Sequence, residues 1–175
     1  LEDPLRSVRI EAALVLADIP SAQLSTEQWA QLEKATTEYI EAQQTMAERP
    51  EAHINLGNLH AAQGETAKAA SAYNRAIELN ADFVPGYVNL ADLYRFQGNE
   101  VAAEQALRQA LAASPGNADV HHALGLSLAR QKRTDAAVKE LRLASLRAPD
   151  NARYVYVYAI ALNSSGQPDR AVLVL

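Results

Sequence analysis

The stretch VPGYVNLADLYRFQGNEVAAEQALRQALAASPGN, residues 84–117, decides the fold of this chain. It contains two runs of about 12 residues with apolar side chains at i, i+3, i+4 and i+7, the spacing of a helix with one buried stripe. Gly98 lies between the runs and Pro115 follows the second. A glycine can end a helix in the left-handed conformation at little steric cost, and a proline does not fit a helix interior. The stretch therefore predicts a helical hairpin.

The hairpin pattern recurs along the chain with a step of 34 residues and no insertions. The frames begin at Pro50, Val84, Ala118 and Ala152. The turn position holds Gly64, Gly98, Lys132 and Gly166, and the position five residues later holds Ala69, Ala103, Ala137 and Ala171. One hairpin cannot bury its own apolar stripe, whereas stacked hairpins bury each other's. The period therefore predicts an all-α repeat domain over 50–175, divided into 50–83, 84–117, 118–151 and a shortened 152–175.

Residues 1–49 do not have the full pattern and predict an N-terminal helical cap of two helices. The first helix is expected from Asp3-Pro4 to about Asp18, with Pro20 ending it. The second is expected over 26–48, because Ser25 and Gln28 have the spacing of a capping box. In this long helix Ala35 and Tyr39 fall 34 residues before Ala69 and Tyr73 of the first frame, so it should dock on the helix at 53–62.

The frames resemble the tetratricopeptide repeat (TPR) family, whose pattern is W-x2-L-G-x2-Y, then A-x3-F and a closing proline. The first frame reads His53-x2-Leu56-Gly57-x2-His60, then Ala69-x3-Tyr73, and the second reads Tyr87-x2-Leu90-Ala91-x2-Tyr94, then Ala103-x3-Leu107. Lys132 and Tyr158 depart from the pattern. The resemblance implies a right-handed superhelical solenoid of antiparallel helix pairs with about 3.5–4 repeats.

A second resemblance concerns the N-terminal part. The string D-P-x3-V-R-x2-A-A from Asp3 resembles the second helix of a HEAT-type repeat. The order of this helix, a long helix and TPRs resembles the tail of bacterial, exported multihaem cytochrome-type proteins. That implies an accessory domain that docks a redox partner, and it favours the periplasm over the cytoplasm while leaving the compartment open. The abrupt ends at Leu1 and Leu175 suggest a fragment of a larger protein.

Composition excludes several functions. The 175 residues include 16 Lys and Arg against 21 Asp and Glu, giving a charge of −5, so we expect no nucleic-acid partner. No stretch approaches the roughly 20 apolar residues of a membrane-spanning helix, so membrane insertion is not expected. With no cysteine, the chain has no disulfide, thiolate metal site or covalent haem attachment.

Catalytic, cofactor and metal sites are not predicted. The sequence has no nucleophile elbow, HExxH motif or phosphate-binding glycine run. His53 and His60 are seven residues apart, whereas a metal-binding pair on a helix usually has i, i+4 spacing. His53, His60 and His121 also occupy positions where the family has bulky residues, so we interpret them as packing residues. The chain is therefore not expected to be an enzyme.

The resemblance places positions 2, 5, 6, 9, 12 and 13 of each frame on the concave face, where Arg153 also falls. The candidate partner-binding residues on this face are Asn58, Asn89, Asp92, Arg95, Phe96, His122, Leu126, Arg130, Tyr156 and Ile160. The amides suit a peptide backbone, the arginines suit carboxylates, and the apolar side chains suit hydrophobic anchors. We therefore predict a protein–protein interaction module for a peptide or protein segment.

Two further points limit this prediction. The TPR clamp for the C terminus of heat-shock chaperones needs basic residues where this chain has Ile54, Asp119 and Ala123, so that ligand is excluded. The apolar segment 172–175 could instead seek another copy of the chain, which leaves self-assembly into a homo-oligomer as an alternative.

Overall fold

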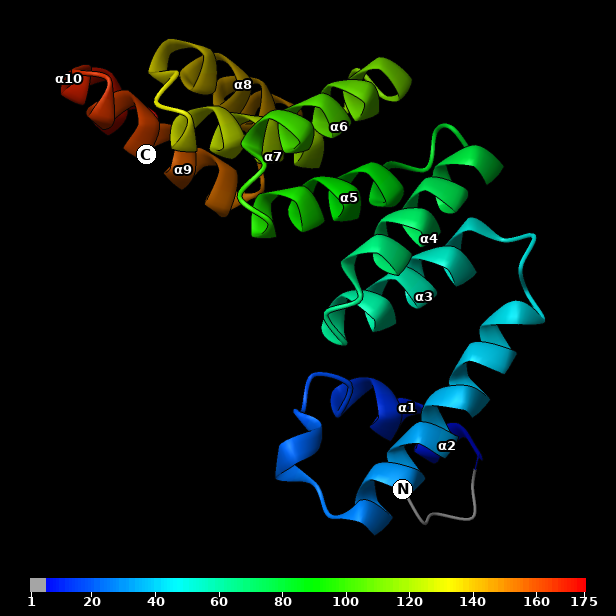
Figure 1. Ribbon diagram of the computed structural model, residues 1–175. Helices are drawn as coiled ribbons and strands as arrows, with labels where there is room; N and C mark the ends of the chain where they lie inside the picture. Colours follow the sequence, from blue (N-terminus) through cyan, green and yellow to red (C-terminus); the bar gives the residue numbers. More distant parts are fainter. Residues whose placement is uncertain (1–5) are drawn as a thin grey trace. The chain divides into compact units, whose positions relative to one another are not determined.

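The computed structural model describes residues 6–175, and this part of the chain is all α-helical (Figure 1). The predicted helix start at Asp3-Pro4 lies outside the described residues. The elements are α1 (Arg6–Val15), the short 3-10 helix η1 (Ser21–Gln23), α2 (Thr26–Gln44), α3 (Pro50–Ala62), α4 (Thr66–Leu79), α5 (Val84–Phe96), α6 (Glu100–Ala113), α7 (Ala118–Arg130), α8 (Thr134–Arg147), α9 (Ala152–Ser164) and α10 (Pro168–Leu173). From Pro50 onward they form the predicted succession of hairpins, a helical-repeat solenoid.

The chain divides into two compact units, Leu1–Gly86 and Tyr87–Leu175. The boundary falls in the first turn of α5, so almost all of α5 belongs to the second unit. None of the helices within residues 6–175 is long and apolar enough to cross a membrane.

In the first unit, α1 packs on α2 through a small apolar cluster of Ala13, Leu32 and Ala35. Arg9 and Glu38 join the same two helices, with 2.8 Å between Nη2 and Oε2. The next contact is between α2 and α3, where Asn55 donates a hydrogen bond of 3.0 Å to Gln43. The predicted docking of the long helix on α3 is therefore confirmed.

The start of α2 agrees with the sequence, but its end does not. Both hydrogen bonds of the Ser25 and Gln28 capping box are present. The predicted end at Glu48 is wrong, because α2 ends at Gln44 and residues 45–48 form turns. Pro50 sets the limit beyond which α2 could not continue, because the residue before a proline disfavours the helical region and Arg49 is extended, with φ −99° and ψ 130°.

The hairpin turns confirm the role of the repeated glycine. Gly64, Gly98 and Gly166 have φ values of 73°, 75° and 77°, in the left-handed region. Lys132, which occupies the glycine position of the third repeat, adopts the same conformation with φ 61°. The left-handed conformation costs a residue with a Cβ roughly 1–2 kcal/mol. The flanking helices therefore impose this geometry on Lys132.

Small residues let the two helices of a hairpin approach closely. Ala69, Ala103 and Ala137 are almost fully buried. At Gly125 in α7, an added Cβ would lie only 2.6 Å from Cγ of Leu141 in α8. Gly125, the glycine of the Leu-Gly pair in the repeat pattern, is therefore needed for close contact between α7 and α8 and not for a special backbone conformation.

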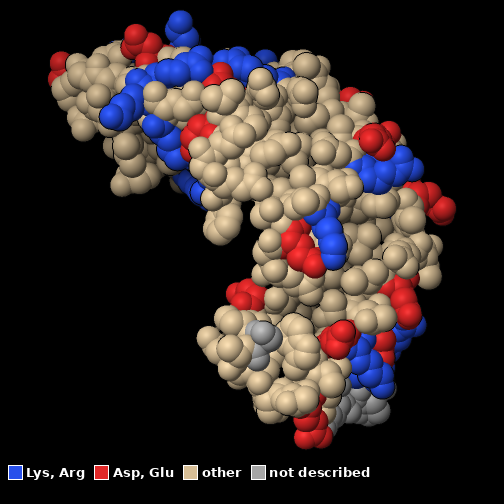
Figure 2. Space-filling model, in the orientation of Figure 1, with Lys and Arg blue, Asp and Glu red and all other residues tan. Residues whose placement is uncertain are grey.

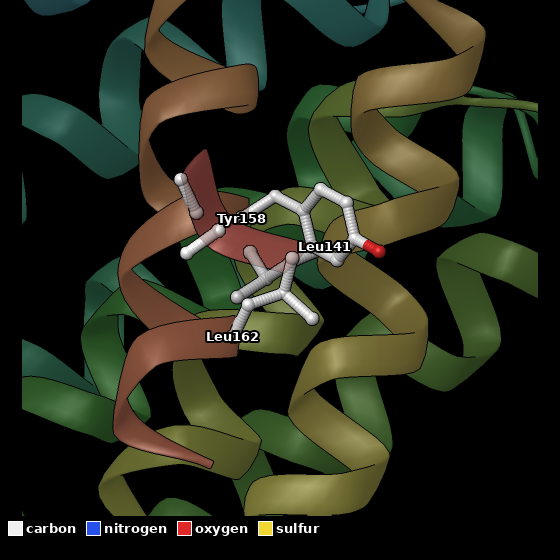
Figure 3. Close-up of a cluster of buried hydrophobic side chains, with 5 residues drawn as sticks. Leu141, Tyr158 and Leu162 are labelled. Carbon is white, nitrogen blue, oxygen red and sulfur yellow. The ribbon is translucent and has the colours of Figure 1, made fainter. Parts of the chain in front are cut away.

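The core of the second unit is a chain of apolar contacts between successive helices. Figure 3 shows Leu141 of α8 against Tyr158 and Leu162 of α9, and Ala171 of α10 completes the cluster. Fully burying one such leucine contributes about 1.5–3 kcal/mol. Tyr158, which departs from the family pattern, is only 5% exposed, so its bulk is accommodated within the core.

Candidate functional site

In the second unit, α5, α7 and α9 are each the first helix of a hairpin, and we call the surface that they present the first-helix face. A pocket of about 270 Å³ lies on this face. Its lining combines apolar side chains with three arginines, an aspartate and a histidine. It is lined by Val88, Ala91, Asp92, Arg95, Ala103, Leu107, His122, Ala123, Leu126, Arg130 and Arg153.

The structure brings five of the ten candidate residues together in this pocket: Asp92, Arg95, His122, Leu126 and Arg130. Three others lie exposed on the same helices outside the pocket, namely Phe96, Tyr156 and Ile160. Asn89 of α5 is half-buried and does not line the pocket. Asn58 belongs to the first unit, where its side chain accepts a hydrogen bond of 2.9 Å from the Tyr73 hydroxyl.

Two of the pocket arginines already have carboxylate partners. Arg95 Nε lies 3.1 Å from Asp92 Oδ1, and both side chains are exposed. Arg130 forms a fork with Glu100, at 2.6 Å and 3.3 Å, and the Ser127 hydroxyl donates to the same carboxylate. The hydrogen bond from Arg130 lowers the pKa of Glu100. An incoming carboxylate would therefore meet Arg130 as a paired group, which the sequence does not indicate.

Glu104 has a structural role that its sequence spacing does not show. The i, i+4 spacing with Arg108 suggests a surface ion pair, and that pair forms at 2.7 Å. However, Glu104 is buried in α6 and also accepts from Gln131 and Arg133 at the end of α7, at 2.9 and 2.6 Å. Burial raises its pKa, but the three hydrogen bonds together outweigh burial, so the pKa is lowered. Glu104 therefore fixes the turn after α7.

His122 is the unusual group of the pocket. Its side chain is 7% exposed, and neither ring nitrogen has a hydrogen-bond partner within residues 6–175. The ring stacks on Tyr154 of α9, with centroids 4.5 Å apart. Burial lowers the pKa of His122, and the nearby Arg153 lowers it further. The lowered pKa favours the neutral ring, which has one donor and one acceptor nitrogen, both covered and unpaired within residues 6–175.

Tyr154 is fixed from the other side. Its hydroxyl donates to a carboxylate oxygen of Asp119 in α7. Burial, followed by this hydrogen bond, raises the pKa of Tyr154 to about 12. The phenol therefore stays protonated and holds the aromatic partner of His122 in place.

Arg153 is the charged pocket residue that is not among the ten candidates. It lies in the first turn of α9 and is exposed. Unlike Arg95 and Arg130, it forms no ion pair with any group in residues 6–175. The available signal was its position, second in the fourth frame, which the family resemblance assigns to the binding face.

The other three histidines are hydrogen-bonded within the chain. His53 contacts the carbonyl of Ala47, and His60 contacts Glu65. His121 lies between Glu140 at 2.7 Å and a backbone carbonyl at 3.1 Å. Over the described part of the chain, no three histidine or carboxylate groups gather as a metal site would require.

Comparison with known proteins supports the repeat assignment. Two family profiles described as tetratricopeptide repeat match the chain, over residues 94–160 and 50–83. No curated protein sequence matches it. The resemblance to a multihaem cytochrome tail therefore stays a prediction.

Solved structures similar to this chain are TPR proteins or share their fold. MamA has a TM-score of 0.66 at 19% identity, covering 86% of this chain and 91% of that one. YrrB, described as a TPR protein with an unusual peptide-binding site, has a TM-score of 0.62 at 22% identity, covering 77% and 69%. A thermophilic TPR protein of Thermus thermophilus has a TM-score of 0.62 at 21% identity, covering 89% and 92%. At these identities the likeness concerns the fold, and with the two profiles and the 34-residue period it means that the chain belongs to the tetratricopeptide repeat family.

Proposed function

We propose that the first-helix face of the second unit binds an extended peptide or protein segment. The observation that supports this most is the pocket itself. It combines apolar lining residues with a buried imidazole that has no partner among residues 6–175. Sites of this kind, mostly apolar with a few placed polar groups, are typical of ligand recognition.

The surroundings of the pocket suit an extended ligand. Phe96 is 83% exposed on α5, and Tyr156 is 57% exposed on α9. Aromatic side chains are enriched at the centres of protein interfaces because they bury a large area at low entropic cost. A segment that passes through the pocket could contact both rings.

Selection from a library of random twelve-residue peptides tests this proposal. Each random peptide should be displayed between constant flanking sequences, and the library should be selected for binding to the whole 175-residue chain. We expect enriched peptides to bind the wild type and to lose at least tenfold in affinity when Ala123→Phe fills the pocket. The matched control, Ala129→Phe, adds the same ring on α7 outside the pocket and should keep the affinity, provided that its circular dichroism is unchanged. Failure to enrich any binder, or equal binding by both variants, would contradict the proposal.

A second candidate function is self-association through α10. Val172 and Leu173 are 74% and 84% exposed, and Leu175 is 76% exposed. Contiguous apolar side chains on a surface often mark an interaction site. This function requires the surface of α10, not the pocket, so the two candidates can be tested separately.

A further inference from the structure

The charges of the pocket leave one positive group without a partner. Asp92 neutralises Arg95, and Glu100 neutralises Arg130. Arg153 lies on the same pocket and has no carboxylate partner among residues 6–175. Arg153 is therefore the pocket arginine open to a negatively charged ligand group, although the Asp119 carboxylate lies nearby, where it accepts from the Tyr154 hydroxyl.

The net charges of the two units also differ: the first unit is acidic and the second, which contains the pocket, is slightly basic. Residues 1–86 contain 6 Lys and Arg against 13 Asp and Glu, whereas residues 87–175 contain 10 against 8. Figure 2 shows basic side chains gathered over the part of the visible surface that belongs to the C-terminal helices. The acidic excess of the chain is therefore confined to the unit that does not contain the pocket.

His122 supplies the second observation. A buried polar group without a partner costs about 1–3 kcal/mol, and native proteins rarely keep one without a reason. An aromatic residue of similar shape could stack on Tyr154 without this cost. The imidazole therefore has a hydrogen-bonding capacity that no group of residues 6–175 uses.

We propose, on the basis of the function proposed above, that the pocket recognises an acidic side chain, aspartate or glutamate, within the bound segment. Its carboxylate pairs with the Arg153 guanidinium and accepts a hydrogen bond from a ring nitrogen of His122. Leu126 and Val88 contact an aliphatic neighbour of the acidic residue. Both ring nitrogens of His122 are covered in the free chain, so binding requires a side-chain shift, as is common at interfaces.

An internal acidic residue fits the face better than a free C terminus. The pocket is flanked by two helices that expose apolar side chains, Phe96 on α5 and Tyr156 with Ile160 on α9. A segment that continues on both sides of its acidic residue can contact all three. A chain that ends at Arg153 has no segment beyond its terminal carboxylate to contact further side chains.

The experiment uses the peptide selected from the library and its Glu→Gln or Asp→Asn counterpart, both acetylated and amidated. Affinities are measured by isothermal titration with the whole chain. We expect the acidic peptide to bind at least tenfold more tightly than its amide counterpart. Arg153→Gln should remove that preference. Arg142→Gln, which changes an arginine of α8 outside the pocket, should leave it intact.

His122→Phe provides an independent readout, because it preserves the ring stack and removes both nitrogens. We expect it to weaken the acidic peptide while the chain keeps its helical circular dichroism. In the wild type, the imidazole NMR signals of His122 should shift with the acidic peptide and not with the amide peptide. A third peptide with an amide at the internal position and a free C-terminal carboxylate should bind no better than the fully amidated one.

The outcomes separate this inference from the proposed function. If selected peptides bind in the pocket but show no acidic residue, or tolerate Arg153→Gln, the acidic-ligand inference is overturned and the peptide-binding function stands. Tighter binding of the free C-terminal carboxylate would also overturn it. If no peptide is enriched, the proposed function fails first.

Discussion

At the scale of single residues, the most informative side chain is His122. Replacing it with phenylalanine removes two buried polar atoms and keeps the stack on Tyr154. Removing an unsatisfied group can stabilise a protein, since its desolvation penalty is about 1–3 kcal/mol. We therefore expect His122→Phe to raise the melting temperature at pH 7.5. A fall in melting temperature would mean that the imidazole is satisfied in solution.

The pH dependence of stability follows from the same residue. The pKa of His122 in the folded chain lies below its ordinary value of 6.5, because burial and Arg153 disfavour the charged form. The unfolded chain therefore takes up the proton first, and stability falls as the pH drops below 6.5. In the His122→Phe variant, the fall in the free energy of unfolding between pH 7.5 and 5.5 should be smaller than in the wild type. Glu100 and Glu104 have pKa values lowered from 4.5, so their contributions are lost at more acidic pH.

Glu104 gives a second prediction at this scale. Glu104→Gln weakens hydrogen bonds to Arg108 and Arg133 at a buried position and should cost about 1–3 kcal/mol in urea denaturation. Glu78 is the control, because it forms an exposed pair with Arg75, and such pairs contribute about 0–1 kcal/mol. Equal costs for the two substitutions would show that Glu104 is no more important than a surface residue.

At the scale of elements, the turn after α7 is the point of strain. Lys132 has φ 61° where the other repeats have glycine. Lys132→Gly should stabilise the chain by about 1 kcal/mol, because the left-handed penalty outweighs the extra entropy of an unfolded glycine. Gly98→Ala, the reverse change in the neighbouring turn, should destabilise it. Thermal denaturation checks both, and a loss of stability with Lys132→Gly would contradict the strain.

The elements also show how far the sequence could predict the structure. The 34-residue period predicts the hairpins from Pro50 onward and the left-handed turns, because both depend on local backbone and side-chain volume. It does not predict the end of α2 at Gln44, which depends on how α3 begins at Pro50. Nor does it reveal that Arg130 is paired with Glu100, since those residues are 30 positions apart and meet only after neighbouring hairpins pack.

The candidate site was predictable to a similar degree. The repeat register places Asp92, Arg95 and Leu126 on one face, and they do line one pocket. The register cannot show which arginine is unpaired, because ion pairing depends on side-chain positions in adjacent helices. The lack of a partner for His122 among residues 6–175 is likewise a property of the packed state.

At the scale of the whole molecule, the exposed α10 surface predicts concentration-dependent association. If α10 binds another copy, sedimentation velocity over a dilution series should show the average mass falling with dilution. Val172→Glu with Leu173→Glu should abolish the effect without loss of helix, because both side chains are exposed. A wild-type chain that stays at 19.0 kDa at every concentration would exclude self-association through this surface.

The most direct test of the central claim, that the first-helix face of the second unit binds an extended segment, is amide hydrogen exchange with and without a library-selected peptide. We expect added protection in α5, α7 and α9, since these helices line the pocket. Protection confined to α2, α3 and α4, or to α10, would contradict the claim.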